Sequence, residues 1–225
     1  MGTLLRFAPP GPLLQMQLRE RLGADPGAEA AEAAIRAEIA YYRAHLDEGR
    51  DAASLADLRR RCAEAMRPAL PPPASAAPVA LLTQALLGAL RFSAYPDAAP
   101  ALRRLRAAGV RLVVVSNWDA SLHERLAETG LQELLDGAVA SAQAGSAKPA
   151  PEIFARALAL AGVAAHGAWH VGDSVEADVA GAHAAGITPV LLDRSGAGGG
   201  PDGVAVIRTL ADLAPLAQYP PGARR

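Results

Sequence analysis

The chain has almost no cysteine: Cys62 is the only one among 225 residues. A single cysteine forms no internal disulfide, which excludes the disulfide framework of a small secreted domain. No apolar run reaches the roughly 18 residues that a membrane span needs, and the first residues lack the basic and then apolar layout of a signal peptide. We therefore expect a cytoplasmic protein that does not enter a membrane.

The chain also lacks an excess of either charge and lacks two common catalytic patterns. Lys and Arg number 22 against 23 Asp and Glu, for a net charge of −1, so we expect no nucleic-acid partner. The five histidines do not form a His-Glu-x-x-His pattern, which argues against a zinc site, and His170 is interpreted as a packing residue. No Gly-x-Ser-x-Gly elbow supports a serine hydrolase.

What the chain does have is enough apolar sequence to fold. Hydrophobic residues make up 51% and charged residues 20% of the chain, which is typical of a globular protein. A length of 225 residues corresponds to one domain, or to one domain with a sizeable insertion.

Strand and helix patterns alternate from about residue 96 to residue 192. Residues 110–115 form a short β-branched run that indicates a buried parallel strand. Further strands are expected at 138–141, 168–171 and 189–192, and helices at 98–108, 122–128, 151–160 and 175–185. This alternation with short connections predicts an α/β fold, with a parallel sheet covered by helices on both faces.

The segment from residue 9 to residue 91 differs, because it contains no convincing strand pattern. It is rich in Ala, Leu, Glu and Arg, which are good helix formers. Helices are expected at 13–22, 28–45, 55–66 and 79–90. The segment is therefore predicted to be an all-helical insertion.

Polar side chains follow three of the expected elements where open α/β sheets place their active sites. Ser116 and Asn117 come directly after a buried strand, and Lys148 lies between a glycine and two prolines just before a helix. Asp173 and Asp178 lie at a strand end and in the first turn of the next helix. Two carboxylates facing one point suit a hard divalent cation such as Mg²⁺.

Each of these features alone also has a purely structural interpretation. A Ser-Asn pair after a strand can be a turn or a cap, a lysine before proline can be a surface charge, and acidic residues at a helix start complement its dipole. Their occurrence together, in order and at strand ends, favours a common site.

The three segments resemble motifs II, III and IV of the haloacid dehalogenase-like (HAD) phosphohydrolase superfamily. The matching patterns are Ser-Asn, Gly-x-x-Lys-Pro-x-Pro-x-Ile-Phe and Gly-Asp-Ser-x-x-x-Asp-x-x-Gly-Ala. The resemblance implies the HAD-IA type: a Rossmann-like three-layer parallel sheet with an inserted helical C1 cap. It places the core domain at residues 1–8 and 92–225, and the cap at residues 9–91.

The resemblance also implies a role for each candidate residue. Ser116 would hydrogen-bond the phosphoryl group that is transferred, with Asn117 as an adjacent contact to phosphate or an orienting group. Lys148 would neutralise the charge of the phosphoryl group and of the nucleophile. Asp173 would bind Mg²⁺, and Asp178 would support the metal either as a direct ligand or by contacting the groups that bind it. Phosphoryl transfer does require such positioning and charge neutralisation.

Motif I of the superfamily is incomplete in this sequence. It normally ends a first, central strand with Asp-x-x-Gly-Thr-Leu, and its first Asp is the nucleophile. The chain begins Met1-Gly2-Thr3-Leu4, so the nucleophile and most of that strand would lie upstream of Met1. We therefore hypothesise that the sequence is truncated. It would be inactive as given, because hydrolysis through an aspartyl-phosphate is impossible without the nucleophilic Asp. Sequencing the native N-terminus tests it.

The sequence thus predicts a Mg²⁺-dependent phosphatase of a small phosphorylated metabolite, acting through an aspartyl-phosphate. Two alternatives stay open: a non-catalytic binding or scaffold protein with the same fold, and a metal-independent 2-haloacid dehalogenase. The Gly172-Asp173 pair together with Asp178 favours the metal-dependent enzyme over the dehalogenase. The substrate, and whether the chain is a monomer or a homodimer, do not follow from the sequence.

Overall fold

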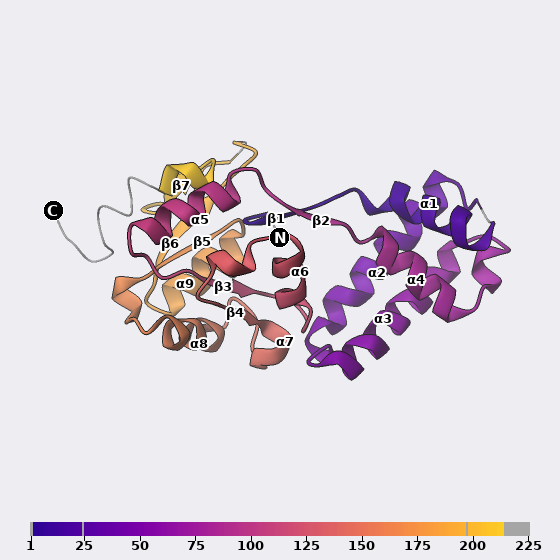
Figure 1. Ribbon diagram of the computed structural model, residues 1–225, viewed down its shortest axis with the longest axis horizontal. Coiled ribbons are helices and arrows are strands. Elements are labelled where there is room, and N and C mark those ends of the chain that lie inside the picture. The colour runs from indigo at the N-terminus through magenta and orange to yellow at the C-terminus, as the bar shows by residue number, and fades with distance from the viewer. Residues whose placement is uncertain (1, 24, 197, 214–225) are drawn as a thin grey trace. The chain divides into compact units, whose positions relative to one another are not determined.

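The protein forms two compact units in a computed structural model that describes residues 2–23, 25–196 and 198–213 (Figure 1). Of the described residues, one unit contains those from Gly2 to Arg6 and from Ala94 to Leu213, and the other contains those from Phe7 to Ser93. The first is built from strands and helices and the second almost wholly from helices. No helix of the described residues has both the length and the apolar character to cross a bilayer.

The strands of the first unit form two parallel ladders. Strand β3 (Val113–Ser116) pairs with β4 (Gly137–Ala140), with Val113 beside Gly137. The second ladder has the order β5-β6-β7, formed by Trp169–Gly172, Thr188–Leu192 and Ala205–Ile207. Because β-branched residues fit a pleated and enclosed surface, the valines of β3 favour a strand here.

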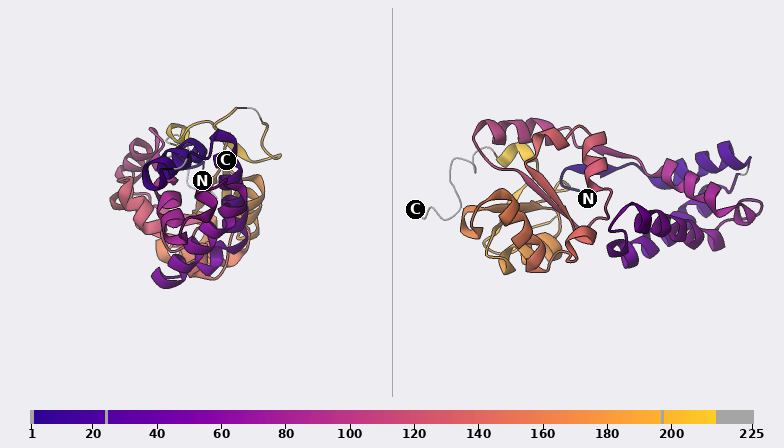
Figure 2. Two further views of the ribbon diagram at one scale, coloured as in Figure 1. Left: turned by 90° about the vertical axis from the view of Figure 1, so that its right-hand side faces the viewer. Right: turned by 60° about the horizontal axis from the view of Figure 1, so that its bottom comes forward.

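Helices connect and cover these strands, as the second view of Figure 2 shows. They are α5 (Ala98–Ala107), α6 (Leu122–Glu128), α7 (Ser141–Ala144), α8 (Pro151–Ala161) and α9 (Gly181–Ala184), with a π-helical segment at Val175–Ala180. Pro151 occupies the first turn of α8, where its missing N–H costs no hydrogen bond. Ile153 and Phe154 of α8 are almost fully buried and pack with Ala182 and Ile187, which fixes the helix against the strands.

The expected α/β fold with parallel strands is confirmed, with corrections in detail. The strand expected at 110–115 begins only at Val113, and the helix expected at 175–185 is a π-helical segment followed by α9. The sheet is also divided: among the described residues β3 and β5 are not hydrogen-bonded to each other. Strand β7 was not predicted, because its three residues carry no periodic pattern.

The second unit contains the four expected helices: α1 (Pro10–Leu22), α2 (Ala28–His45), α3 (Ala52–Met66) and α4 (Val79–Ala89). Its core is a single cluster, in which Leu14, Leu18, Leu58, Met66 and Leu82 are fully buried. Asp51 caps α3 by accepting from the backbone N–H of Ser54 at 2.9 Å.

Short 3₁₀ turns complete both units, at Leu46–Glu48, Arg67–Ala69, Ala74–Ala76, Gln132–Leu134, Ala165–Gly167 and Leu210–Asp212.

The chain passes between the units through two short strands that the sequence did not predict. Strand β1 (Leu5–Phe7) pairs with β2 (Phe92–Ala94). The N–H of Tyr95 donates to the carbonyl of Leu4 at 2.9 Å, and that of Ala8 donates to Arg91 at 3.0 Å. The two chain passages are therefore hydrogen-bonded to each other at both ends.

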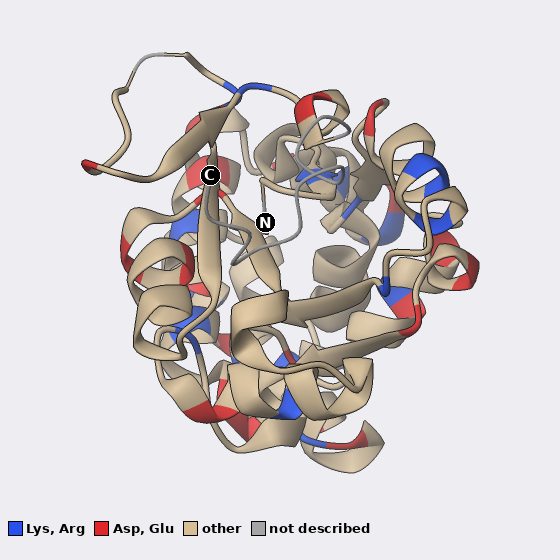
Figure 3. Ribbon diagram, turned by 90° about the vertical axis from the view of Figure 1, so that its left-hand side faces the viewer, with Lys and Arg blue, Asp and Glu red and all other residues tan. Residues whose placement is uncertain are grey.

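Acidic and basic residues are interspersed along the ribbon in the view of Figure 3. This agrees with a composition in which neither charge is in excess.

One buried carboxyl group in the helical unit predicts a pH-dependent stability. Glu38 in α2 is only 4% exposed, and burial raises its pKa from 4.5 to about 7, although a hydrogen bond with Cys62 lowers it in part. Between pH 4.5 and about pH 7 the unfolded chain loses the Glu38 proton, whereas the folded chain keeps it. The free energy of unfolding therefore falls as pH rises through this range. We expect Glu38→Gln to stabilise the protein by about 3 kcal/mol at pH 8 and by under about 1 kcal/mol at pH 5.

Urea unfolding followed by circular dichroism at the two pH values measures this difference. Glu29→Gln is the matched control, because Glu29 lies exposed on the same helix. A gain that is the same at both pH values, or equal in the two variants, would contradict the assignment of the pH dependence to Glu38.

Candidate active site

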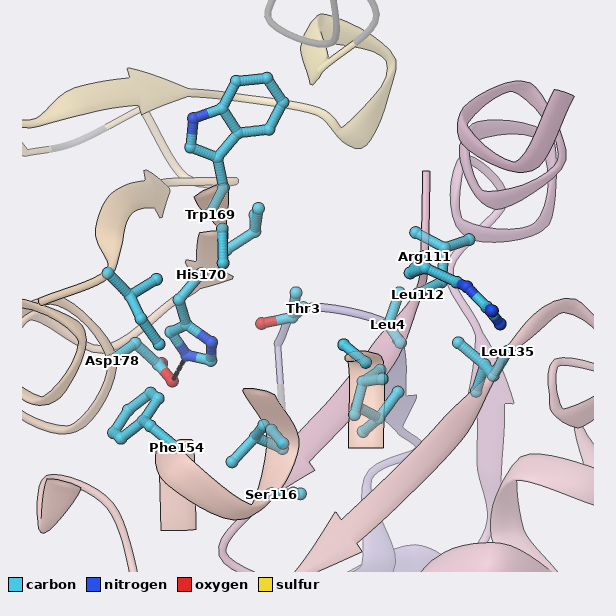
Figure 4. A pocket seen from close by; sticks show the side chains of 18 of the residues that line it. Thr3, Leu4, Arg111, Leu112, Ser116, Leu135, Phe154, Trp169, His170 and Asp178 are labelled. Carbon is cyan, nitrogen blue, oxygen red and sulfur yellow. Dashed lines mark hydrogen bonds and ion pairs between the residues drawn. The ribbon is translucent and has the colours of Figure 1, made fainter. Parts of the chain in front are cut away.

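The five candidate residues line one pocket of about 610 Å³ in the α/β unit. Ser116 ends β3, Asn117 follows it, and Asp173 follows β5, so all three lie at the carboxyl ends of parallel strands. Lys148 comes from the loop before α8, and Asp178 from the π-helical segment after β5. Figure 4 shows the pocket between the residues of β5, including Trp169 and His170, and those around β3, including Leu112 and Ser116. This is the edge where open α/β sheets bind ligands.

Asn117 fixes the loop that carries Lys148. Its side-chain Nδ2 donates to the carbonyl of Lys148 at 2.9 Å, and its Oδ1 accepts from the backbone N–H of Lys148 at 2.7 Å. Both backbone groups of Lys148 are thereby held by one side chain. The amide thus ties the loop before α8 to the end of β3.

The ammonium of Lys148 is held by Asp178. Lys148 Nζ donates to Asp178 Oδ1 at 2.5 Å, and His170 Nε2 lies 2.8 Å from the same oxygen. The other oxygen, Oδ2, accepts from the backbone N–H of Ser174 at 3.0 Å. Both carboxylate oxygens of Asp178 are therefore already engaged.

Electrostatics keep this buried carboxylate ionised. Burial by itself would raise the pKa of Asp178, which is only 4% exposed. The hydrogen bond with His170 and the positive charge of Lys148 outweigh this effect, so the pKa lies well below its usual range. Asp178 is thus an anion that orients Lys148 at neutral pH.

The close approach of β5 to Asp178 requires a glycine at position 172. A Cβ added to Gly172 would lie 2.1 Å from Asp178 Cγ, closer than two carbon atoms can approach. This explains in physical terms why a glycine precedes Asp173 in the motif.

Asp173 lies exposed next to the first described residues of the chain. Its Oδ1 accepts from the hydroxyl of Thr3 at 2.8 Å. Gly2 has a φ of +126°, and a Cβ there would lie 2.3 Å from Asp173 Oδ2. Only glycine combines this backbone conformation with such a close approach to the carboxylate.

Arg194 holds residues 2 and 3 in this position. Its guanidinium donates to the carbonyls of Gly2 at 2.9 Å and Thr3 at 2.8 Å, and pairs with Asp97 at 2.9 Å. It also lies 3.8 Å from the centre of the Tyr95 ring, a cation–π contact. The partners of Arg194 thus come from two separate segments of the unit, residues 2–3 and residues 95–97, and it keeps Thr3 beside Asp173.

The structure brings the predicted residues together around one pocket, but the two carboxylates differ in burial. Asp173 is exposed, whereas Asp178 is buried in its pair with Lys148. The sequence-based interpretation of His170 as a packing residue is incomplete. It packs edge-on against Phe154, with ring centres 4.9 Å apart, and also binds Asp178 (Figure 4). Arg194 was missed because no local pattern distinguishes it from other arginines.

The two carboxylates differ in whether they are available to bind a metal ion. The described residues contain no group of three or more His, Cys, Asp or Glu that could hold a metal ion. Asp173 is exposed on the pocket wall, and a single carboxylate suits Mg²⁺, which usually keeps several waters and completes its shell with substrate phosphate oxygens. The residues present therefore fit Mg²⁺ through Asp173, with Asp178 acting on Lys148.

Known proteins similar to this chain agree on one family. A model of the haloacid dehalogenase-like hydrolase family matches residues 2–186. Haloacid dehalogenase-like hydrolase domain-containing protein 3 of Bos taurus is 43% identical over 91 residues, 40% of this chain and 36% of that protein. Ribulose-1,5-bisphosphate 5-phosphatase of Halopiger xanaduensis is 36% identical over 117 residues, 48% of this chain and 49% of that protein. The matched segments thus span less than half the length of these curated relatives.

A solved structure gives a match over nearly the whole chain. The crystal structure of a 2-haloacid dehalogenase from Pseudomonas syringae is 26% identical with a TM-score of 0.65. The match covers 97% of this chain and 94% of that one. The α/β fold with its helical segment is therefore shared with a solved relative.

Proposed function

The chain belongs to the haloacid dehalogenase-like hydrolase family, and on this premise we propose that it is a Mg²⁺-dependent phosphohydrolase of a small phosphorylated metabolite. The relative from Halopiger xanaduensis, named as a phosphatase, supports this reaction class. The observation that carries the proposal is the placement of Ser116, Lys148 and Asp173 around one pocket at the ends of two parallel strands. A hydroxyl donor, a cation and a metal-binding carboxylate are what phosphoryl transfer requires.

Each residue has a defined part in this proposal. Ser116 donates to a phosphoryl oxygen, and Lys148 neutralises the charge that the phosphate brings into a half-enclosed site. Asn117 and Asp178 are positioning residues, because the first holds the backbone of Lys148 and the second its ammonium. Mg²⁺ bound at Asp173 would supply a further positive charge to the phosphate oxygens.

Hydrolysis through an aspartyl-phosphate needs one more carboxylate that is free to attack phosphorus. Among the described residues that line the pocket, Asp173 and Asp178 are the only acidic ones. The first is assigned to the metal, and the second is held by Lys148 and His170. We therefore expect residues 1–225 to bind phosphate with Mg²⁺ without turning over an ester. The hypothesis of a misplaced start concerns Met1, which lies outside the described residues.

The helical segment, residues 9–91, would serve as the cap of the α/β core, residues 1–8 and 92–225. In this proposal the cap covers the bound ester, excludes water during transfer and then releases the product. Specificity for one metabolite would reside in cap side chains.

A non-catalytic phosphate-binding protein is the second candidate. It is favoured by the same observation, that both acidic residues lining the described pocket are otherwise engaged. A metal-independent 2-haloacid dehalogenase, the activity named for the solved relative from Pseudomonas syringae, is the third.

Ligand titrations by calorimetry separate the two phosphate-binding candidates from the dehalogenase with the chain as it is. We expect inorganic phosphate to bind, and EDTA to lower its affinity by about tenfold or more, because one charged contact contributes about 1.5 to 3 kcal/mol. Binding of 2-chloropropionate unaffected by EDTA would favour the dehalogenase and overturn the proposal. A folded chain that binds neither ligand would exclude both enzymes.

A further inference from the structure

Three side chains of the α/β unit form a connected series next to Lys148. Asp178 Oδ1 accepts from the Lys148 ammonium, and His170 Nε2 lies 2.8 Å from the same oxygen. The ring of Phe154 meets the imidazole edge-on, with ring centres 4.9 Å apart (Figure 4). His170 therefore lies between a buried aromatic ring and the carboxylate that holds the only lysine of the chain.

The imidazole of His170 donates to Asp178 and does not accept from it. Although burial raises the pKa of Asp178, the hydrogen bond with His170 and the charge of Lys148 lower this pKa well below its usual range. The carboxylate therefore carries no proton at neutral pH, and an ionised carboxylate has acceptor sites only. The proton shared by the two groups thus belongs to Nε2 of His170.

The donors to Asp178 differ in rigidity. Oδ2 accepts from the backbone N–H of Ser174 at 3.0 Å, whereas Oδ1 receives the two side-chain donors. Lysine has a flexible four-carbon stem, so Lys148 by itself cannot fix the plane of the carboxylate. His170 has a short side chain on strand β5, and its ring packs against Phe154. It is therefore the rigid side-chain donor at Oδ1.

The ring of Phe154 is itself confined. It belongs to α8 and is only 1% exposed. A Cβ added to Gly181 would lie 2.7 Å from this ring and 3.0 Å from the Cα of Pro149, the residue after Lys148. Helix α8, the glycine of α9 and the loop of Lys148 are thus in close contact around Phe154, which gives the imidazole a fixed surface to rest on.

We propose that His170 is a positioning residue for Lys148: its Nε2–H fixes Asp178 Oδ1, and this oxygen in turn fixes the Lys148 ammonium at the pocket. The imidazole contacts no ligand in this assignment. A charge that is fixed before the ligand arrives binds an anion more tightly than a mobile one, because less side-chain freedom is lost on binding. The inference rests on the proposed function only for this last step, since the order of Lys148 without ligand does not depend on phosphate.

Two substitutions of similar shape test whether the donor of His170 is what matters. Gln and Met have similar length and volume, but only Gln carries an N–H that can replace Nε2–H. Labelling of lysine with ¹⁵N reports on the ammonium of Lys148 alone. We expect its protons to exchange about threefold faster or more in His170→Met than in the wild type, because the loss of a hydrogen bond to a charged group changes an equilibrium by about tenfold or more and part of this reaches Lys148. His170→Gln should restore the exchange to within about twofold.

The other outcomes of this comparison contradict the proposal. Equal exchange in the wild type and in His170→Met, with both folded by circular dichroism, would show that the imidazole only fills space. Equally fast exchange in His170→Met and His170→Gln would assign the effect to lost packing against Phe154. Either result would overturn the positioning role.

Calorimetric titration with inorganic phosphate and Mg²⁺ separates this inference from the proposed function. We expect phosphate to bind His170→Met about threefold more weakly or worse, and His170→Gln about as well as the wild type. Faster ammonium exchange with unchanged phosphate affinity would confine His170 to local stability and overturn its positioning role. A wild type that binds no phosphate would contradict the proposed function, whereas the exchange comparison would still decide whether His170 orders Lys148.

A measurement on the wild type needs no variant to fold. Correlation of imidazole ¹⁵N with the ring protons by NMR, with His170 assigned through the backbone of β5, shows which ring nitrogen carries a proton. We expect Nε2 of His170 to be protonated at pH 8. An Nε2 without a proton could not donate to Asp178, and this result would overturn the proposal directly.

Discussion

Replacement of Asp178 by alanine is expected to destabilise the α/β unit by about 3 to 5 kcal/mol, the usual effect of removing one partner of a buried ion pair. The carboxylate is 4% exposed and pairs with Lys148 and His170. Without it, Lys148 and His170 would lose their shared acceptor inside a half-enclosed site. The N–H of Ser174 would also lose its acceptor.

Asp173→Ala is the matched control, because Asp173 is exposed on the same pocket and accepts one hydrogen bond. It should change the free energy of unfolding by about 1 kcal/mol or less. Urea unfolding of both variants at pH 7 gives the comparison. Similar losses in the two variants would contradict the central structural role of Asp178.

The same pair predicts how acid affects the protein. Because the pKa of Asp178 is lowered in the folded state, its contribution is present above the unfolded pKa and is lost as pH falls below it. The difference in stability between the wild type and Asp178→Ala should therefore shrink below about pH 4.

Replacement of Lys148 by alanine should weaken phosphate binding by about 10- to 100-fold, since a hydrogen bond from a charged group contributes about 1.5 to 3 kcal/mol. Lys148 is the only lysine in the chain, and it lines the pocket at the carboxyl ends of β3 and β5. Its ammonium is held in place by Asp178 before any ligand binds. A preorganised charge is what a phosphate site requires.

Arg111→Ala is the control for this variant. Arg111 lies two residues before β3 and lines the same pocket, so this substitution also removes one positive charge from it. Calorimetric titration of both variants with inorganic phosphate and Mg²⁺ measures the effect, after circular dichroism has shown that they are folded. If Arg111→Ala weakens binding as much as Lys148→Ala does, phosphate is attracted by net charge rather than held by Lys148.

The sequence predicted the placement of the candidate residues better than the pairing of the strands. Ser116, Lys148 and Asp173 follow local motifs, and their order along the chain was enough to place them at one edge. The helices of residues 9–91 followed from leucine and alanine spacing, because an amphipathic helix carries its period over many residues. Strands β1, β2 and β7 have three residues each, which is too short for a period to show.

Long-range pairs could not be predicted from local patterns. The sequence suggested that Asp173 binds a cation and that Asp178 supports it directly or indirectly, but no local pattern indicated that Asp178 pairs with Lys148, 30 residues away. The burial of Glu38 in α2 likewise depends on packing between helices, because its carboxyl group hydrogen-bonds Cys62 of α3. The division of the strands into two ladders likewise could not be predicted, because it depends on which strands are hydrogen-bonded to each other.

Selective labelling of lysine with ¹³C gives the most direct test of the phosphate site, because Lys148 is the only lysine and its Cε will give a single side-chain signal. We expect this signal to shift when inorganic phosphate is added with Mg²⁺, and to shift less at the same phosphate concentration with EDTA. A signal that does not move at saturating phosphate, in a chain that is folded, would contradict the assignment of Lys148 to phosphate binding and with it the proposed function.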